Sequence, residues 1–402
     1  MKHLLLLILL LAGCGPSSSG DAGIDVATAP WEAIEAEARG QRVNLMMWMG
    51  DPFINEYMRG YVAPALMERY GIDLTISSGQ GKQVVSLLMT EIEAGKAMSD
   101  VDMAWINGET FYQLRQIDAL YGPFVDRLPN ARYIDLENPF IGKDFQQPVE
   151  GFEAPWGNVQ FALIHDTLRT PEPPRTREAL AAWVRAHPGK FTFDIGFAGM
   201  TFLKSLLIDI AGGPEVLAGP FDGRLYARYA PELWRYVNDI EPYLWMKGET
   251  YPAGLAQLHQ MFATGEVDFT MSNNDGEVDN KVLQGLFPPT AAAFVLEGGT
   301  IQNSHYLGIV KTAEHKAGAM VAINFMLSPE AQLQKYDPAV WGDGTVLAID
   351  RLPADWQARF ASVPGRTHAP RREVIQPYAL PELAPEYMIR LYDDFRNEVL
   401  AR

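Results

Sequence analysis

The feature that most constrains the fold is an alternation of short apolar runs with amphipathic segments between residues 43 and 120. Each apolar run is short enough for one buried strand, and a polar turn follows it. The predicted strands are residues 43–49, 73–76 and 101–106. The predicted helices after them are residues 53–66, with Pro64 as a kink, 84–92 and 111–120. This order predicts a mostly parallel sheet, in which ligands bind beyond the carboxyl ends of the strands.

A second α/β unit is predicted beyond a proline-rich connector at residues 171–174. The predicted strand at residues 156–164 leaves the first unit before this connector, the strand at 267–271 belongs to the second unit, and the strand at 306–310 lies beyond it. The predicted helices of the second unit are residues 176–186, 202–210, 232–239 and 254–263, and a further helix at residues 316–327 follows the last strand. A chain of 402 residues, 48% of them hydrophobic, can bury two cores. We therefore expect an α/β protein of two lobes, each with a mostly parallel sheet flanked by helices.

The N-terminus reads as an export signal. Lys2 and His3 precede an unbroken apolar run at residues 4–11, which is too short to cross a bilayer. The run ends in Leu-Ala-Gly-Cys, which resembles the bacterial lipoprotein box and makes Cys14 the expected lipidation site. A plain secretory signal with an incidental cysteine is the alternative. We expect a signal peptide at residues 1–13 and a lipid-anchored tether at 14–40, because residues 15–29 are rich in Gly, Ser, Asp and Ala.

Charge and composition argue against several classes of partner. The chain has 33 basic and 50 acidic residues, a formal charge of −17, which repels nucleic acid. Cys14 is the single cysteine and the seven histidines are scattered, so no metal-ligand spacing is present. The loop SSGQGK at residues 77–82 lacks the glycine spacing and the Ser or Thr of a P-loop. We expect no nucleic acid partner, no metal and no cofactor.

Four local patterns resemble a known family. They are PRTREALAAW, FATGEVDFTMSNND, SHYLGIVKTAEHKAGAMVAINFMLSPEAQ, and the set MMWMGD, WINGE, YLWMKGETYP and KYDPAVWGDGTVL. In this order they resemble the extracellular solute-binding proteins of ABC importers, in the two-lobed class of maltose- and thiamine-binding proteins. The last set resembles the YnjB-type branch of binding lipoproteins. The resemblance runs from about residue 41 to about residue 347.

The resemblance implies a type II periplasmic-binding-protein fold with the ligand cleft between two hinged lobes. Lobe 1 would contain residues 41–157 plus about 298–328, and lobe 2 residues 158–297 plus about 329–402. The expected partners are a small-molecule ligand, an ABC permease with its ATPase, and a membrane reached through lipidated Cys14. We expect a monomer in the periplasm or at the cell surface.

Candidate ligand-binding residues lie in the loops after the strands and at the crossings between lobes. They are Trp48, Gly50, Asp51, Ser78, Gly79, Trp105, Asn107, Glu109, Trp156, Asn273, Asn274, Tyr306, Trp341 and Asp343. Several have a structural alternative: Asp51 before Pro52 suits a helix cap, and the glycines and asparagines suit turns. Asn303 and His305 precede the returning strand, where a lone histidine is more often structural.

Aromatic faces beside carboxylates favour a small organic cation, an amine or a thiamine-like heterocycle. A carbohydrate remains an alternative, because sugar sites also combine stacking rings with polar groups. An exported hydrolase is a further alternative, although the chain has no G-x-S-x-G or H-E-x-x-H motif and its one thiol lies in the lipoprotein box. A surface lipoprotein that adheres or senses without a permease is a third reading. We expect a binding protein rather than an enzyme.

Overall fold

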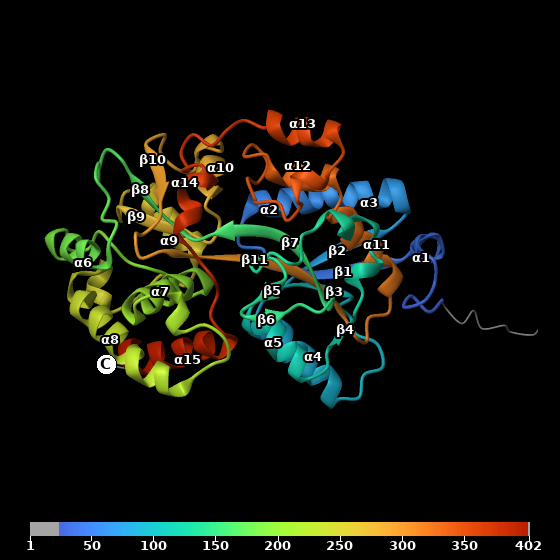
Figure 1. The fold of residues 1–402 in the computed structure, drawn as a ribbon, viewed down its shortest axis with the longest axis horizontal. Helices are drawn as coiled ribbons and strands as arrows, with labels where there is room; N and C mark the ends of the chain where they lie inside the picture. The colour runs from blue at the N-terminus through green and yellow to red at the C-terminus, as the bar shows by residue number, and fades with distance from the viewer. Residues whose placement is uncertain (1–23, 401–402) are drawn as a thin grey trace, which may run out of the picture.

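Two buried strands connect the two lobes of the protein, whose computed structural model describes residues 24–400. Strands β7 (Glu153–Gln160) and β11 (Thr300–Val310) run antiparallel through the middle of the molecule (Figure 1). Their pairing extends from Gln160 opposite Gln302 to Glu153 opposite Gly308. Ala154 and Leu307 pack in a first hydrophobic core, whereas Phe161 and Ile301 pack in a second. The strand pair therefore belongs to both lobes.

The secondary structure outside this pair consists of many short elements. The strands are β1 (Arg42–Met47), β2 (Asp73–Ser78), β3 (Met103–Ile106), β4 (Leu120–Tyr121), β5 (Lys143–Asp144), β6 (Gln147–Pro148), β8 (Ala162–Asp166), β9 (Phe269–Ser272), β10 (Ala291–Phe294) and β12 (Ala379–Leu380). The helices are α1 (Trp31–Ala38), α2 (Pro52–Glu56), α3 (Ala63–Tyr70), α4 (Lys82–Glu93), α5 (Glu109–Gln116), α6 (Arg177–Ala186), α7 (Phe197–Ala211), α8 (Gly223–Ile240), α9 (Leu255–Ala263), α10 (Glu277–Leu283), α11 (Lys316–Met326), α12 (Pro329–Tyr336), α13 (Ala354–Ser362), α14 (Arg372–Ile375) and α15 (Pro385–Phe395). Within residues 24–400, no helix is both long and apolar enough to cross a bilayer.

The first lobe is built on the alternation of strands and helices predicted from the sequence. Its sheet has the order β12-β11-β3-β1-β2, and β1 pairs in parallel with both β2 and β3. Alternate residues of β1, namely Val43, Leu45 and Met47, are fully buried. The parallel part confirms the prediction, while β11 enters antiparallel to β3 as the returning crossover strand.

The predicted helix at residues 53–66 is interrupted as expected, by a π-helical turn. Helix α2 continues into this turn at Tyr57–Val62 and then into α3. Pro64 has no N–H group, so a carbonyl one turn earlier cannot find its usual α-helical donor and the hydrogen-bond ladder shifts.

The second lobe differs from the expected mostly parallel sheet. Its sheet has the order β10-β8-β9, and both neighbours run antiparallel to β8. The single strand expected at residues 156–164 is divided at Phe161 into β7, which pairs with β11, and β8, which pairs with β9 and β10. Apolar periodicity reports the face of a strand but not its direction, so the prediction was wrong on this point.

The expected boundary between the lobes at residue 329 does not match the packing. Ala331, Trp341 and Leu347 lie in the first core rather than the second. The Gln332 amide donates to the Trp156 carbonyl at 3.0 Å and holds α12 against the crossover strand. The chain reaches the second lobe again only between Phe360, which lies in the first core, and Ala369, which lies in the second.

The C-terminal part of the range predicted as a tether, residues 14–40, is folded. Residues 14–23 lie outside the described part of the chain, whereas residues 31–38 form α1. Ile34 and Ala38 are fully buried, and α1 packs against α11. Trp31, Ile34 and Ala38 follow a helical spacing of three and four residues, which the small polar residues before them obscured.

We predict that Ile34→Ala lowers the free energy of unfolding by about 2–5 kcal/mol, because it leaves a cavity in the first core. Urea denaturation followed by circular dichroism measures the change. Glu37→Ala, at an exposed position of the same helix, is the control and should change stability by less than about 0.5 kcal/mol. Equal stability of the Ile34 variant and the wild type would show that α1 does not pack in solution.

Candidate functional site

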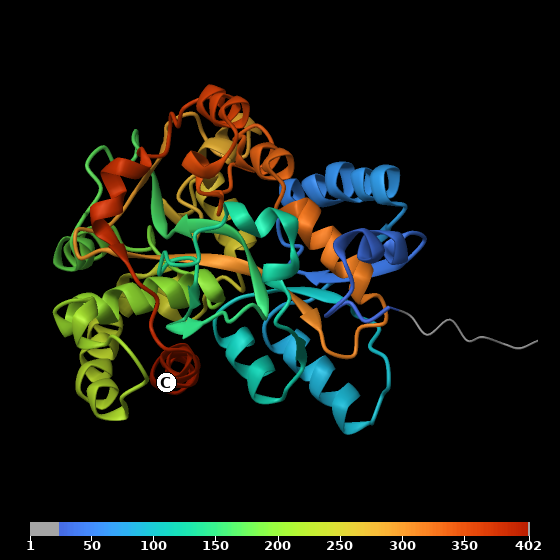
Figure 2. The ribbon, with the colours of Figure 1, turned by 45° about the vertical axis from the view of Figure 1, so that its right-hand side comes forward.

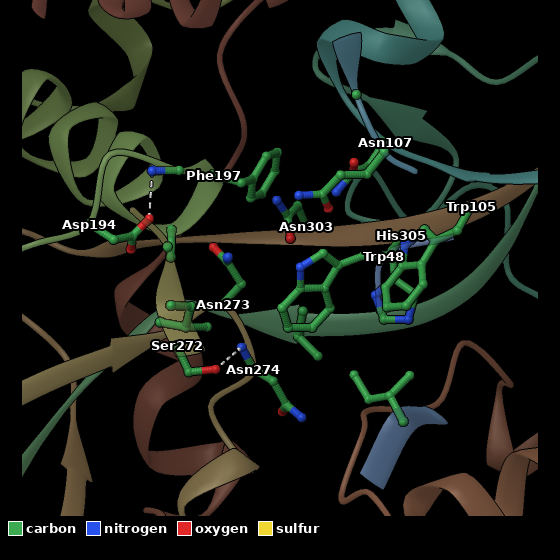
Figure 3. Close-up of a pocket in the computed structure, with 18 of the residues that line it drawn as sticks. Trp48, Trp105, Asn107, Asp194, Phe197, Ser272, Asn273, Asn274, Asn303 and His305 are labelled. Carbon is green, nitrogen blue, oxygen red and sulfur yellow. Dashed lines mark hydrogen bonds between the residues drawn. The ribbon is translucent and has the colours of Figure 1, made fainter. Parts of the chain in front are cut away.

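A cavity of about 460 Å³ lies between the two lobes, beside the crossover strands (Figure 3). The first lobe contributes residues that follow β1, β2 and β3, and the second contributes residues around α7, β9 and α15. Val159 of β7, together with Asn303 and His305 of β11, forms the wall that joins the two sides. A solute in this cavity would contact both lobes and both connecting strands.

Many of the residues predicted from the sequence line this cavity. They are Trp48, Trp105, Asn107, Glu109, Asn273, Asn274, Trp341 and Asp343. Most follow the carboxyl end of a strand: Trp48 comes after β1, Asn107 and Glu109 after β3, and Asn273 after β9. The cavity therefore lies at the predicted strand ends, while contact of these residues with a ligand stays a prediction.

Asp51 and Gly50 do not line the cavity. Asp51 caps α2, accepting hydrogen bonds from the N–H groups of Phe53 at 2.7 Å and Ile54 at 3.1 Å. Its other oxygen forms an ion pair with Lys281 of the second lobe. A side chain at Gly50 would meet the Trp48 indole at 2.5 Å, so the glycine makes room for that ring. Both residues thus have structural roles that account for them.

Four more predicted residues lie outside the cavity. Ser78 ends β2 and Gly79 packs against Met46, so the cavity is reached only by the next residues, Gln80, Gly81 and Lys82. Trp156 and Tyr306 are fully buried. The Tyr306 hydroxyl donates to the Ile141 carbonyl at 3.0 Å, because successive residues of a strand face opposite sides and it is Asn303 and His305 that face the cavity.

One side of the cavity is aromatic. The ring centroid of His305 lies 5.0 Å from that of Trp105 and 5.9 Å from that of Trp341, with the latter pair stacked. Trp156 supports this group from behind, 5.3 Å from Trp105 and 5.3 Å from Trp341. The Trp48 indole also lines this side of the cavity (Figure 3).

Asp343, beside the aromatic side, already has its counter-charges. Its Oδ2 lies 3.1 Å from His305 Nε2 and 2.5 Å from Lys335 Nζ. Burial alone would raise the pKa of Asp343, but Lys335 and His305 outweigh burial and lower it to about 2. This carboxylate is therefore neutralised by the protein.

Glu277 is similarly engaged by neighbouring side chains. It accepts a hydrogen bond from Ser272 and lies 3.2 Å from Lys281 Nζ. Because Lys281 also pairs with Asp51, a buried ionic group joins the cavity wall of the second lobe to the first helix of the first lobe.

Two other carboxylates of the cavity each retain an oxygen without a protein partner. Glu109 Oε2 and Asp194 Oδ2 are buried and accept no hydrogen bond. Burial raises the pKa of Glu109 to about 7, against the opposing effects of its own backbone N–H and Lys204. Burial also raises the pKa of Asp194 to about 6, opposed by the backbone N–H groups of Gly196 and Gly199. At a pH above these values, the cavity contains two carboxylates, each with an oxygen that no hydrogen-bond donor of the described residues contacts.

These two carboxylates come from opposite lobes but lie near the same side chain. Glu109, Asp194 and Tyr392 line the same cavity, and burial raises the pKa of Tyr392, with the charges of the two carboxylates raising it further. Lys82 stands above the Tyr392 ring, with Nζ 5.3 Å from its centroid. Figure 3 shows Asp194 and Phe197 on the side opposite Trp48, Trp105 and His305. The cavity therefore has an aromatic side and a carboxylate side.

Sequence reasoning missed Asp194, Phe197 and Tyr392. Asp194 stands two residues before Gly196 at the start of α7, so a carboxylate ahead of a glycine and a long helix was an available signal. Tyr392 belongs to an amphipathic helix, in which nothing in the periodicity separates a core residue from a cavity residue. Helix α15 packs beside α5 of the first lobe, and Figure 2 shows it, in red, close to that lobe.

Among residues 24–400, no group of three or more His, Cys, Asp or Glu side chains is placed to hold a metal ion.

A cavity between two α/β lobes joined by crossover strands defines a periplasmic-binding-protein fold of type II. Residues 62–360 match the family model described as bacterial extracellular solute-binding protein. The chain is 36% identical over 327 residues to the protein YnjB of Escherichia coli strain K12, a match that covers 80% of this chain and 84% of YnjB. The chain belongs to this bacterial extracellular solute-binding protein family.

Solved structures with the same fold are more distant in sequence. The spermidine/putrescine ABC transporter substrate-binding protein PotD of Streptococcus pneumoniae has a TM-score of 0.59 at 16% identity, covering 89% of this chain and 99% of PotD. The periplasmic binding protein AfuA of Actinobacillus pleuropneumoniae has a TM-score of 0.64 at 13% identity, covering 89% of this chain and 98% of AfuA. These likenesses confirm the predicted fold class.

The family assigns the general role. The protein is the substrate-binding component of an ABC transporter, acts outside the cytoplasm, and is not an enzyme. Its partners are a small molecule and the transporter.

We predict that Glu109→Gln stabilises the ligand-free protein at pH 8 by about 1–3 kcal/mol but has little effect at pH 4. The folded state holds the pKa of Glu109 near 7 rather than at its ordinary 4.5, so stability present below pH 4.5 is lost as the pH rises through 7. The glutamine avoids that loss. Urea denaturation at both pH values measures the change in the free energy of unfolding, with Glu93→Gln, at an exposed position, as the control. A variant no more stable than the wild type at pH 8 would contradict a buried, unneutralised carboxylate.

Proposed function

We propose that the cavity captures a small organic cation, an amine or a thiamine-like heterocycle, for delivery to the permease. The observation that carries this proposal is the pair Glu109 and Asp194: two carboxylates from opposite lobes, each with a buried oxygen that lacks a protein partner, in one aromatic-lined cavity. A buried carboxylate is costly without a counter-charge, and a bound cation would supply one.

The other side of the cavity supports the same ligand class. Cations bind favourably over the faces of tryptophan rings, and flat heterocycles stack on them. Trp48, Trp105 and Trp341 offer such rings, while Asp343 beside them is already neutralised by Lys335. We therefore place the charged nitrogen of the ligand near Glu109 and Asp194 and its apolar part near the tryptophans.

A carbohydrate is the second candidate, favoured by the combination of these rings with four asparagine side chains, Asn107, Asn273, Asn274 and Asn303. Proteins of the same fold are described with both kinds of ligand: PotD is named for the amines spermidine and putrescine, and AfuA is described with the sugar phosphate fructose-6-phosphate bound. The unpaired carboxylates favour the cation, because neither a neutral sugar nor a phosphate ester would neutralise them.

The proposed mechanism is closure of the lobes on the ligand. A cation that contacts Glu109 and Asp194 at once binds the closed form more tightly than an open one and shifts the population toward it. The ion pair between Asp51 and Lys281 would form in the same movement.

We propose that one lobe holds the first hydrophobic core, including residues 331–360, that the other holds the second, and that the protein works as a monomer.

We predict that organic cations raise the melting temperature of the protein, whereas neutral sugars and phosphate esters do not. A ligand at a hundred times its dissociation constant should stabilise by about 2.7 kcal/mol, a shift of several degrees. Differential scanning fluorimetry at pH 8 with thiamine, benzylamine, spermidine, maltose and glucose-6-phosphate measures the shift. The cation-induced shift should vanish in Glu109→Gln and in Asp194→Asn but persist in the control Glu93→Gln. A shift with the sugar or the ester alone would discard the cation proposal.

We also propose that the chain is anchored by a lipid on Cys14, which lies outside the described residues. The lipoprotein-box residues at 11–14 support this, and the family implies export. The anchor would hold the binding protein near its permease.

We predict that the wild-type protein incorporates labelled palmitate and fractionates with membranes, whereas Cys14→Ser does neither. Labelling and fractionation of expressing cells measure both properties. Ser17→Ala, next to the same cleavage region, is the control and should behave as the wild type. Unlabelled wild-type protein would favour a plain secretory signal.

A further inference from the structure

Asn303 stands where β11 borders the cavity, and Figure 3 shows its side chain between the two sides of the site. Its Nδ2 donates a hydrogen bond to Glu382 Oε1 at 2.8 Å. Only 8% of the residue is exposed. The amide is thus engaged at its nitrogen by a group behind the cavity wall, and no donor from the described residues hydrogen-bonds to its oxygen.

Because Glu382 is a carboxylate, it can form a hydrogen bond with only one end of the Asn303 amide. An ionised carboxylate accepts hydrogen bonds and cannot donate them, so it must face the amide NH₂ and not the amide oxygen. As long as Glu382 is a carboxylate, the Asn303 oxygen is turned toward the cavity.

Lys204 supplies the charge that keeps Glu382 in this role. Its Nζ lies 2.6 Å from Glu382 Oε2, and Lys204 is fully buried. The ammonium is held in place by two aromatic faces, 3.9 Å from the Phe145 centroid and 5.6 Å from the Phe197 centroid. A buried carboxylate requires such a partner, and an ammonium can only donate. Lys204 therefore orients Glu382, and Glu382 in turn orients the Asn303 amide.

We propose that the ion pair of Lys204 and Glu382 fixes Asn303 with its amide oxygen toward the ligand, so that Asn303 selects solutes with an N–H or O–H donor at this position. Lys204 and Glu382 are positioning residues, and Asn303 is the contact. The inference refines the proposed function, since it rests on the cavity being the solute site and adds a hydrogen-bond donor to the required ligand.

A single change should reverse the amide. In Glu382→Gln, Lys204 still demands an acceptor, so the new glutamine would turn its oxygen to Lys204 and its NH₂ to Asn303. Two NH₂ groups cannot satisfy each other, and Asn303 would rotate to present its oxygen to the glutamine and its NH₂ to the cavity. The variant should then prefer an acceptor on the ligand over a donor.

The orientation can be tested without any ligand. The side-chain amide protons of Asn303 can be assigned in ¹⁵N NMR spectra by their loss in Asn303→Ala. In the wild-type protein they should be protected from exchange with water, because the amide donates to the Glu382 carboxylate. In Glu382→Gln they should exchange at least about tenfold faster, because they face the cavity. If Glu382→Gln does not fold, the double variant Lys204→Met/Glu382→Leu, which removes both charges, should show the same loss of protection. Rapid exchange in the folded wild type would overturn the inference, whether or not a cation binds.

The selectivity can be tested with a matched pair of cations. Thiamine carries an amino donor on its pyrimidine ring, and oxythiamine replaces that donor with a carbonyl acceptor. Wild-type protein should bind thiamine at least about tenfold tighter, and Glu382→Gln should erase or reverse that ratio. In an Asn303→Ala background, Glu382→Gln should change the ratio by less than about twofold, which a general structural defect would not explain.

A wild-type affinity ratio of one between thiamine and oxythiamine would overturn the role of Asn303 in selection. Failure of both compounds to bind would count against the proposed cation class, and the exchange rates would then decide the orientation of the amide by themselves.

Discussion

The antiparallel pairing of β7 with β11 is the constraint on which the rest of the structure depends. Both strands are fully buried, and each begins in one hydrophobic core and ends in the other. Because successive residues face opposite sides, Asn303 and His305 line the cavity while Tyr306 packs behind it. The strand pair therefore connects the lobes, supplies the wall that joins the two sides of the cavity, and provides the element about which the lobes can move.

The distribution of charge around the cavity separates carboxylates that support the fold from those that remain available. Asp343 with Lys335, Glu382 with Lys204, and Asp51 with Lys281 are buried and paired. Glu109 and Asp194 each have a buried oxygen that lacks a protein partner, and burial raises the pKa of both. Such groups lower the free energy of unfolding of the ligand-free protein, and proteins commonly retain destabilising groups where function requires them. We propose that the bound cation restores this stability by pairing with the two carboxylates.

Much of the fold, but less of the site, was predictable from the sequence. Apolar runs and helical spacing located β1, β2, β3 and the helices after them, and strand ends led to Trp48, Trp105, Asn107 and Glu109. Periodicity could not give strand direction, so the antiparallel sheet of the second lobe was missed. It also could not fix which residue of a loop or strand faces inward: Ser78 and Tyr306 were predicted where Gln80 and His305 line the cavity. Tyr392 reaches the site only through tertiary packing, which no local pattern encodes, whereas Asp194 had a weak local signal in its place two residues before the glycine at the start of α7.

The most direct test is a crystal structure of the protein with the solute that stabilises it most. We predict a positively charged nitrogen within about 4 Å of both the Glu109 and Asp194 carboxylates, at the distance where an opposite charge favours the ionised form. We also predict an apolar part against Trp48 or Trp105 and a donor toward Asn303. An anionic group held by Lys82 and the start of α4, with no cation near Glu109 and Asp194, would contradict the proposed function.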